Sequence, residues 1–323
     1  MCMARNDNGR RNSAERPPVK ISARIAYLAV RSLIGVIGRI PRVLAYGFCE
    51  TCGLLVYCLD RKHRKIGMTN LAIAFPDRDE RWRRSVLRSS FLRIADHFVE
   101  LCHLSEITTR EIGERVVYEP GCGLENYEAA KKLGKGVMFL TGHTCAWELL
   151  PLAQAALRNP LGVVVRPLDN PLLDRWLTAT RSRFGNKVIE KESALRRILR
   201  FFSEDEDVGI LIDQNVQEKD GLFVPLFGQQ ACTTASPATF ALRTGTPVVF
   251  AFLIPRKRKG HYRIRFYPPI ELDPSEDRKA DLVKYTALFN RYIEEIIREN
   301  PDCWLWGHRR FRTQPDGSDP YSG

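Results

Sequence analysis

From residue 136 onward, the chain alternates short apolar runs with stretches of helical length. The runs are 137–140, 163–165, 208–212 and 248–254, and residues 262–267 alternate apolar and polar side chains like a strand with one exposed face. Strands that alternate with helices are typical of α/β proteins, in which crossover helices connect neighbouring strands. We therefore predict a single α/β domain around a mostly parallel or mixed sheet flanked by helices.

The excess positive charge of the chain lies in its first third. The 323 residues have a net charge of +12, with 19 basic and 7 acidic side chains in residues 1–93 and 31 of each in residues 94–323. A nucleic-acid-binding domain usually spreads its basic face over the folded body. The asymmetry therefore favours an arm that lies on an anionic membrane surface, with no nucleic acid as partner. A basic nucleic-acid-binding protein is the alternative from a different class.

Residues 21–60 are apolar and carry a stripe of basic side chains. The stripe, which covers about 80° of a helix, consists of Arg24, Arg31, Arg39 and Arg42. Such a helix can lie in the headgroup plane with its guanidinium groups on lipid phosphate; the alternative is a buried helix whose arginines have internal partners. Pro41 is predicted to end this first helix, and residues 43–59 form a second apolar segment that spans or lies in the bilayer. No uncharged run approaches the roughly 18 residues of a confident spanning helix.

The nine cysteines form an odd, scattered set. This pattern does not indicate a disulfide framework and favours a reducing compartment. Cys49 and Cys52 are spaced like half a zinc site, but no second Cys/His pair matches them, so we expect no metal. Cys145 and His143 are two residues apart, and side chains so spaced on a helix diverge. We therefore interpret Cys145 as a packed thiol rather than a nucleophile.

Residues 136–148 hold the candidate catalytic residues. An apolar strand ends just before His143, and a helix is predicted to begin near Thr144. Ligand sites of open α/β sheets gather at the carboxyl ends of the strands. If His143 lies on the turn before the helix, its ring can fold back toward Glu148, whose carboxylate would fix the tautomer and raise the basicity of the free nitrogen. The alternative is an inert, hydrogen-bonded histidine at a strand end.

This segment and several later blocks resemble a known family. His143 and Glu148 match the H-x4-(D/E) signature of the glycerolipid acyltransferase superfamily, and Trp147-Glu148 is similar to the ending found in the bacterial lipid A late (lauroyl/myristoyl) acyltransferases. The further matches, in the family's order, are Arg166, Asn170-Pro171, Asp174, Arg181, Asp213-Gln214, 221–228, 233–238, 243–247 and 304–312. The resemblance covers roughly residues 22–315.

The resemblance implies transfer of a fatty acyl chain from an acyl-carrier-protein thioester to a hydroxyl of a lipid A precursor. His143 would take the hydroxyl proton while Glu148 orients the ring, with no covalent acyl-enzyme, no cofactor and no metal. The implied partners are acyl carrier protein, a membrane glycolipid acceptor and the anionic membrane surface. The implied location is the cytoplasmic face of the bacterial inner membrane.

Further residues in these blocks are candidates for binding substrate phosphate or stabilising developing negative charge. They are Arg166, Asp213, Arg243, His308, Arg309 and Arg310. Guanidinium suits both roles, although Arg166 can equally form a structural ion pair, for example with Asp213. We expect Asp213 to support the site rather than react. Residues 308–310 are surface charge by default, and Trp304 and Trp306 beside them lie at the membrane interface or pack in the core.

The sequence departs from the family pattern at Thr144, Cys145 and Ala146, where the family commonly has aromatic-Gly-Asn. This departure leaves open the acceptor, which can be another lipid such as a phosphatidylinositol mannoside or an aminolipid. An acyl thioesterase, in which water replaces the hydroxyl, is a further alternative. We predict a disordered basic tail (1–20), a membrane-associated helical segment (21–60), an acyltransferase domain (61–315) and a C-terminal tail (316–323).

Overall fold

A computed structural model describes residues 20–118, 120–191 and 194–322, so the predicted disordered tail lies outside the described residues except for Lys20. The α-helices are α1 (Ile21–Arg39), α2 (Arg42–Leu59), α3 (Arg61–Ala74), α4 (Glu80–Leu104), α5 (Thr109–Arg115), α6 (Leu124–Lys131), α7 (Leu149–Leu157), α8 (Pro171–Arg181), α9 (Ala194–Ser203), α10 (Ser236–Thr244) and α11 (Arg278–Glu299). The strands are β1 (Val116–Val117), β2 (Met138–Thr141), β3 (Leu161–Val165), β4 (Lys187–Glu190), β5 (Asp207–Leu211), β6 (Gly221–Leu226), β7 (Gln229–Thr234), β8 (Val248–Pro255) and β9 (Tyr262–Phe266).

The main sheet has seven strands in the order β1-β9-β8-β2-β5-β3-β4. Its pairs are parallel except for β8 and β9, which are antiparallel. The α/β prediction with a mostly parallel sheet is therefore confirmed. The basic run 256–259 forms the turn between the two antiparallel strands. The strands β6 and β7 form a separate antiparallel hairpin, packed on α11.

Both faces of the sheet are buried, which is why its central strands are continuously apolar. Alternate residues of β2 point to opposite sides: Met138 and Leu140 belong to the core under α9, α10 and α11, and Phe139 belongs to the core under α6 and α7. The side chains of β8 also alternate between the two faces, and Phe250 and Phe252 belong to the core under α9, α10 and α11. The period of two thus places two hydrophobic cores on one sheet.

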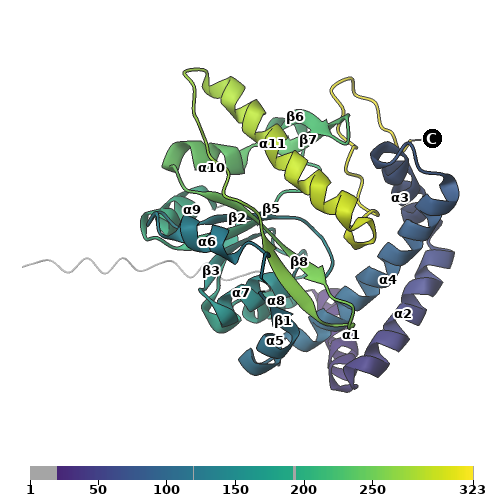
Figure 1. The fold of residues 1–323 in the computed structure, drawn as a ribbon. Helices are drawn as coiled ribbons and strands as arrows, with labels where there is room; N and C mark the ends of the chain where they lie inside the picture. Colours follow the sequence, from purple (N-terminus) through teal and green to yellow (C-terminus); the bar gives the residue numbers. More distant parts are fainter. Residues whose placement is uncertain (1–19, 119, 192–193, 323) are drawn as a thin grey trace, which may run out of the picture.

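The helices α1 and α2 pack beside α4 at one side of the domain (Figure 1). Pro41 separates them, as predicted, and each is long and apolar enough to cross a membrane by length and composition. Many of their large apolar side chains are exposed: Ile21, Ile25, Leu28, Leu33, Val36, Val43, Leu44, Phe48, Leu55, Val56 and Leu59. A water-exposed apolar surface of this kind is typical of a membrane-contacting face.

Candidate active site

His143 and Asp213 meet because they follow neighbouring parallel strands. The strand β2 ends at Thr141, β5 ends at Leu211, and the two strands pair in register, so the residues after them share one edge of the sheet. The Nδ1 atom of His143 lies 2.8 Å from Oδ1 of Asp213, and the backbone N–H of His143 donates to Oδ2 of Asp213 at 2.8 Å. The carboxylate therefore orients both the ring and the turn that carries it.

Trp304, near the C-terminal end of the chain, completes the binding of this carboxylate. Its Nε1–H donates to Oδ2 of Asp213 at 2.7 Å, and both side chains are buried. With Asp213 accepting from Nδ1, the Nε2 atom of His143 carries the lone pair. That atom lies 3.3 Å from Nε2 of Gln214, and the His143 side chain is 20% exposed. The proton-accepting nitrogen is thus the one closer to solvent.

The electrostatics of the pair suit a general base. Burial alone would lower the pKa of His143, but the nearby Asp213 carboxylate and its hydrogen bond more than offset burial and raise the pKa above its ordinary value. Burial would likewise raise the pKa of Asp213, but the His143 ring and the hydrogen bonds from His143 and Trp304 lower it to about 2. Asp213 therefore stays ionised, as the orienting partner must.

Glu148, the predicted partner of His143, is held by a different residue. The guanidinium of Arg181 on α8 binds it through two contacts, one of them from Nε to Oε2 at 2.9 Å. Burial would raise the pKa of Glu148, but the hydrogen bond and charge of Arg181 lower it. The expectation that Glu148 orients the imidazole thus differs from the structure, in which the ring bonds to Asp213. The charge of Glu148 still contributes to the raised pKa of His143.

The turn after His143 explains this difference. The helix predicted to begin near Thr144 begins instead at Leu149, because Thr144 forms an antiparallel bridge with Trp304 and Cys145 has a left-handed φ of 46°. Glu148 is consequently displaced toward α8. The backbone N–H of Cys145 also donates to the carbonyl of Cys303 at 2.8 Å, which fixes the turn to the C-terminal segment.

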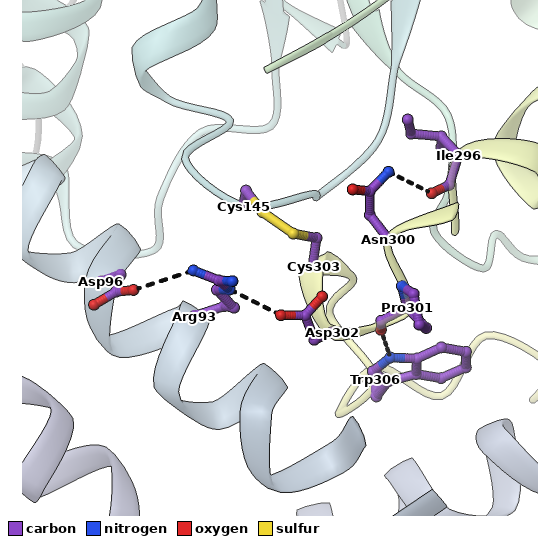
Figure 2. Close-up of a disulfide and its surroundings, with 9 residues drawn as sticks. All are labelled: Arg93, Asp96, Cys145, Ile296, Asn300, Pro301, Asp302, Cys303 and Trp306. Atoms are coloured by element: carbon purple, nitrogen blue, oxygen red, sulfur yellow. Dashed lines mark hydrogen bonds and ion pairs between the residues drawn. A yellow bond between two sulfur atoms is a disulfide. The ribbon is translucent and has the colours of Figure 1, made fainter. Parts of the chain in front are cut away.

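Cys145 and Cys303 form a disulfide across a sequence separation of 158 residues (Figure 2). The expectation that Cys145 is a packed thiol is therefore wrong, and the scattered cysteines, which did not indicate a disulfide framework, include this one bonded pair. The sequence spacing concealed that the two segments are neighbours in the fold. Beside the disulfide, Arg93 of α4 bonds Asp302 at 2.9 Å and lies 3.8 Å from Asp96 (Figure 2). Covalent and ionic links thus join the turn that carries His143, α4 and the C-terminal segment.

Reduction of this disulfide should destabilise the fold. A crosslink that closes so long a loop restricts the unfolded chain, so we expect dithiothreitol or Cys303→Ser to lower the free energy of unfolding by about 2–4 kcal/mol. Urea unfolding with and without reductant measures this difference. Cys58→Ser, at an exposed free cysteine, is the matched control and should leave the unfolding curve unchanged. Equal stability of the oxidised and reduced proteins would contradict the prediction.

An apolar cavity lies between the sheet and α7, beside the turn that carries His143. Its walls include Phe139, Val163, Val165, Leu211 and Leu150, and Trp147, Glu148 and Arg181 close it on the side of His143. The ring of Trp147 links the cavity to His143, because it meets the His143 ring edge-on with a centroid distance of 5.3 Å and stacks on His97 at 3.6 Å. A space of this chemistry suits a hydrocarbon chain.

Two of the predicted cations lie apart from this pair. Arg166 follows the carboxyl end of β3, is largely exposed and lies 3.7 Å from Asp169, so the suggested ion pair with Asp213 is wrong. Arg243 is exposed in the last turn of α10, just before the amino end of β8. Since β8 runs parallel to β2, Arg243 lies at the edge of the sheet opposite to His143.

The run 308–310 enters the fold instead of covering its surface. The Nε2 atom of His308 accepts the backbone N–H of Asn215 at 3.0 Å, and burial lowers the pKa of His308 to about 4. Arg310 is 0% exposed, and its guanidinium donates to the carbonyl of Cys232 at 2.8 Å, so surface charge is the wrong interpretation for it. Arg309 is partly exposed, 3.9 Å from Asp319. Trp304 and Trp306 pack in the core.

Sequence reasoning missed the roles of Arg181 and Trp304 in this site. Both residues stand in blocks that match the family, but neither the helical period nor the spacing relates them to a carboxylate far away in the chain. Only the fold shows that α8 brings Arg181 to Glu148 and that the C-terminal segment brings Trp304 to Asp213.

The fold and site together define a class of protein: an α/β enzyme with a histidine–carboxylate pair at the carboxyl edge of a parallel sheet, beside an apolar cavity. Comparison with known families is more specific. The family described as bacterial lipid A biosynthesis acyltransferase matches residues 18–313, so the chain belongs to this acyltransferase family.

Relatives in this family include enzymes of differing acyl specificity. The lipid A biosynthesis lauroyltransferase of Escherichia coli (strain K12) is 28% identical over 82% of this chain and 85% of its own length. A lipid A biosynthesis acyltransferase of Haemophilus influenzae (strain ATCC 51907 / DSM 11121 / KW20 / Rd) is 25% identical over 81% and 79%. The lipid A biosynthesis myristoyltransferase of Escherichia coli (strain K12) is 21% identical over 92% and 90%.

Proposed function

We propose that this protein transfers a fatty acyl chain from an acyl-carrier-protein thioester to a hydroxyl of a lipid A precursor, at the cytoplasmic face of the bacterial inner membrane. Family membership supports acyl transfer in lipid A biosynthesis. The observation that carries the chemistry is the His143–Asp213 pair, which leaves the lone pair of His143 on Nε2, the nitrogen that can accept a proton. The exposed apolar side chains of α1 and α2 support docking on a membrane.

In this mechanism, Nε2 of His143 removes the proton of the acceptor hydroxyl. The resulting oxyanion attacks the thioester carbonyl and forms a tetrahedral intermediate. The intermediate collapses to the new ester and expels the thiolate of the carrier, which takes the proton back from the His143 imidazolium. Asp213 holds the ring and stabilises its charged form. No acyl-enzyme forms, and the reaction needs no metal or cofactor besides the acyl donor.

Glu148 and Arg181 have a supporting part in the proposal. Their ion pair closes the cavity beside Trp147 and places a second negative charge near His143. Arg166 and Arg309 are at least partly exposed and remain candidates for contacts with substrate phosphate, whereas Arg310 and His308 shape the site from within. Arg243 is exposed too, but it lies at the opposite edge of the sheet. The acidic acyl carrier protein would dock on basic surface near the entrance of the cavity.

The cavity between the sheet and α7 would take the acyl chain of the donor. Val165 lines it and is half-buried, so Val165→Phe should shorten the available space. Because each methylene excluded from an apolar pocket costs about 0.8 kcal/mol, kcat/KM for a long acyl donor should fall several-fold more than kcat/KM for a short one. Assays with a series of acyl-carrier-protein thioesters measure this ratio. Equal losses for all chain lengths would place the acyl chain elsewhere.

One experiment separates the proposed reaction from its alternatives. The purified enzyme is incubated with an acyl-carrier-protein thioester, with and without a lipid A precursor, and the lipid products are identified by mass spectrometry. We expect ester formation only with the acceptor and slow thioester loss without it. Rapid release without acceptor would indicate a thioesterase. A deletion strain whose lipid A is unchanged, but which lacks acyl groups on another lipid, would redirect the acceptor assignment.

A further inference from the structure

A polar groove lies between α1, the start of α2 and the connection from α4 to α5. Its basic side chains are Arg31 and Arg39 from α1 and Arg42 from α2, and its acidic side chains are Glu106 and Glu111. These three arginines belong to the arginine stripe of the N-terminal segment, whereas Arg24, the fourth member of the stripe, does not line the groove. The stripe is therefore not uniform: part of it converges on one concave site.

The acidic side chains pair with only one arginine of this cluster, Arg42. Glu111 is engaged by Thr108, whose backbone N–H and hydroxyl donate to its Oε2 at 3.0 and 3.1 Å, and its other oxygen lies 3.4 Å from Nη1 of Arg42. Arg39 donates to the carbonyl of Gly35 at 2.8 Å. Within the described part of the chain, no carboxylate lies at ion-pair distance from Arg31 or Arg39.

Buried hydrogen-bond donors gather at this place without acceptors. In the described residues, Arg31 Nη1, Arg42 Nε, Trp176 Nε1 and Arg183 Nε are buried and have no hydrogen-bond partner. Arg31 lies over the Trp176 ring at 4.9 Å, and Arg183 donates to the carbonyls of Ser105 and Ile107 at the groove wall. Of these donors, only those of Arg31 and Arg42 belong to side chains that line the groove. Since an unpaired buried donor is costly, an oxyanion bound there would supply an acceptor that these two guanidinium groups lack.

The surroundings indicate where that oxyanion comes from. The two helices that carry these arginines also expose apolar side chains, namely Leu33 and Val36 on α1 and Val43 and Leu44 on α2. A ligand that combines an anionic head with hydrocarbon fits this surface, and guanidinium groups bind phosphate through directed, charge-assisted hydrogen bonds. The groove is connected to the active site through α8, because Arg31 lies over the ring of Trp176 and the same helix carries Arg181.

We propose that this groove binds the phosphate group of a membrane lipid through Arg31, Arg39 and Arg42. The inference rests on the membrane docking of the proposed function. It assigns the three arginines a defined phosphate site, in contrast to a diffuse attraction between a basic helix and an anionic surface. By holding a lipid phosphate beside α8, the groove would set the depth and orientation of the domain on the membrane.

The test uses the full-length protein and sedimentation with vesicles. One set contains phosphatidylcholine with phosphatidic acid, and the other has equal surface charge supplied by oleate. Arg31→Gln is compared with Arg24→Gln, which removes the same charge from an exposed position of the same helix. We expect the wild-type protein to bind vesicles with phosphatidic acid more tightly than vesicles with oleate. Arg24→Gln should lower the affinity for both vesicles about fivefold and keep this preference. Arg31→Gln should lose the preference, with its affinity for phosphatidic acid vesicles reduced about tenfold or more.

Equal behaviour of the two variants, or no preference in wild type, would overturn the proposal. Inorganic phosphate is a further arm: if it raises the Tm of wild type but not of Arg31→Gln while the vesicles show no preference, the ligand is a free phosphate and the lipid assignment is wrong. Arg39→Gln is the second variant should Arg31→Gln unfold. These vesicles hold no acyl donor or lipid A precursor, so a failure here is distinguishable from a failure of the acyl-transfer assay.

Discussion

Replacing His143 by alanine is expected to lower kcat/KM for acyl transfer about 10²–10⁴-fold while leaving the protein folded. Positioned general-base catalysis contributes this much, and the backbone N–H of His143 and the indole N–H of Trp304 would still donate to the Asp213 carboxylate. Acyl transfer from an acyl-carrier-protein thioester to a lipid A precursor, followed by mass spectrometry, measures the effect. Circular dichroism and the Tm report the fold.

His261 provides the matched control for this substitution. It is a partly exposed histidine after the turn between β8 and β9, so His261→Ala should retain wild-type activity. Near-wild-type activity of a purified His143→Ala protein would exclude the proposed mechanism. The pH profile gives an independent check: because Asp213 raises the pKa of His143, activity should fall as the pH drops through a value above the ordinary histidine pKa.

The α/β architecture was predictable because its signal is local. The apolar runs that became β2, β3, β5 and β8 are continuous, since both faces of the sheet are buried. The short strand β4 was not predicted, because Lys187–Glu190 has an exposed charged residue at each end and no recognisable apolar run. A strand at the sheet edge depends on its neighbour for its conformation, and this dependence leaves little trace in the local sequence.

The site was predictable only in part, for a related reason. His143 and Asp213 were assigned to strand ends by local pattern, but their pairing depends on β2 and β5 being adjacent, a property of strand order that no single segment encodes. Spacing favoured Glu148 as the partner because a helix was expected from Thr144. In the structure the disulfide of Cys145 and the β-bridge between Thr144 and Trp304 hold this segment in a turn, so the helix begins only at Leu149. Long-range contacts thus decided which carboxylate faces the imidazole.

Asp213→Asn should be the second most damaging substitution, with kcat lowered between about 10²- and 10⁴-fold. The amide has nearly the same shape but no charge, and it can present a donor to Nδ1 and so favour the wrong tautomer. The pKa of His143 should fall, because its largest raising influence is removed, and the acid limb of the pH–kcat/KM profile should move to lower pH. Asp169→Asn, at an exposed carboxylate beside Arg166, is the control and should leave the profile unchanged.

Glu148→Gln distinguishes the two carboxylates, because it is expected to act mainly on stability. It leaves the Arg181 guanidinium buried without its partner, which costs about 3–5 kcal/mol in similar pairs, and urea unfolding measures this loss. Glu148→Gln combined with Arg181→Gln should recover much of the stability, since neither charge is then left alone. The acid limb should shift less than in Asp213→Asn, because Glu148 is a lesser influence on the pKa of His143. A larger shift in Glu148→Gln than in Asp213→Asn would make Glu148 the orienting carboxylate during catalysis, and the pairing with Asp213 a resting arrangement.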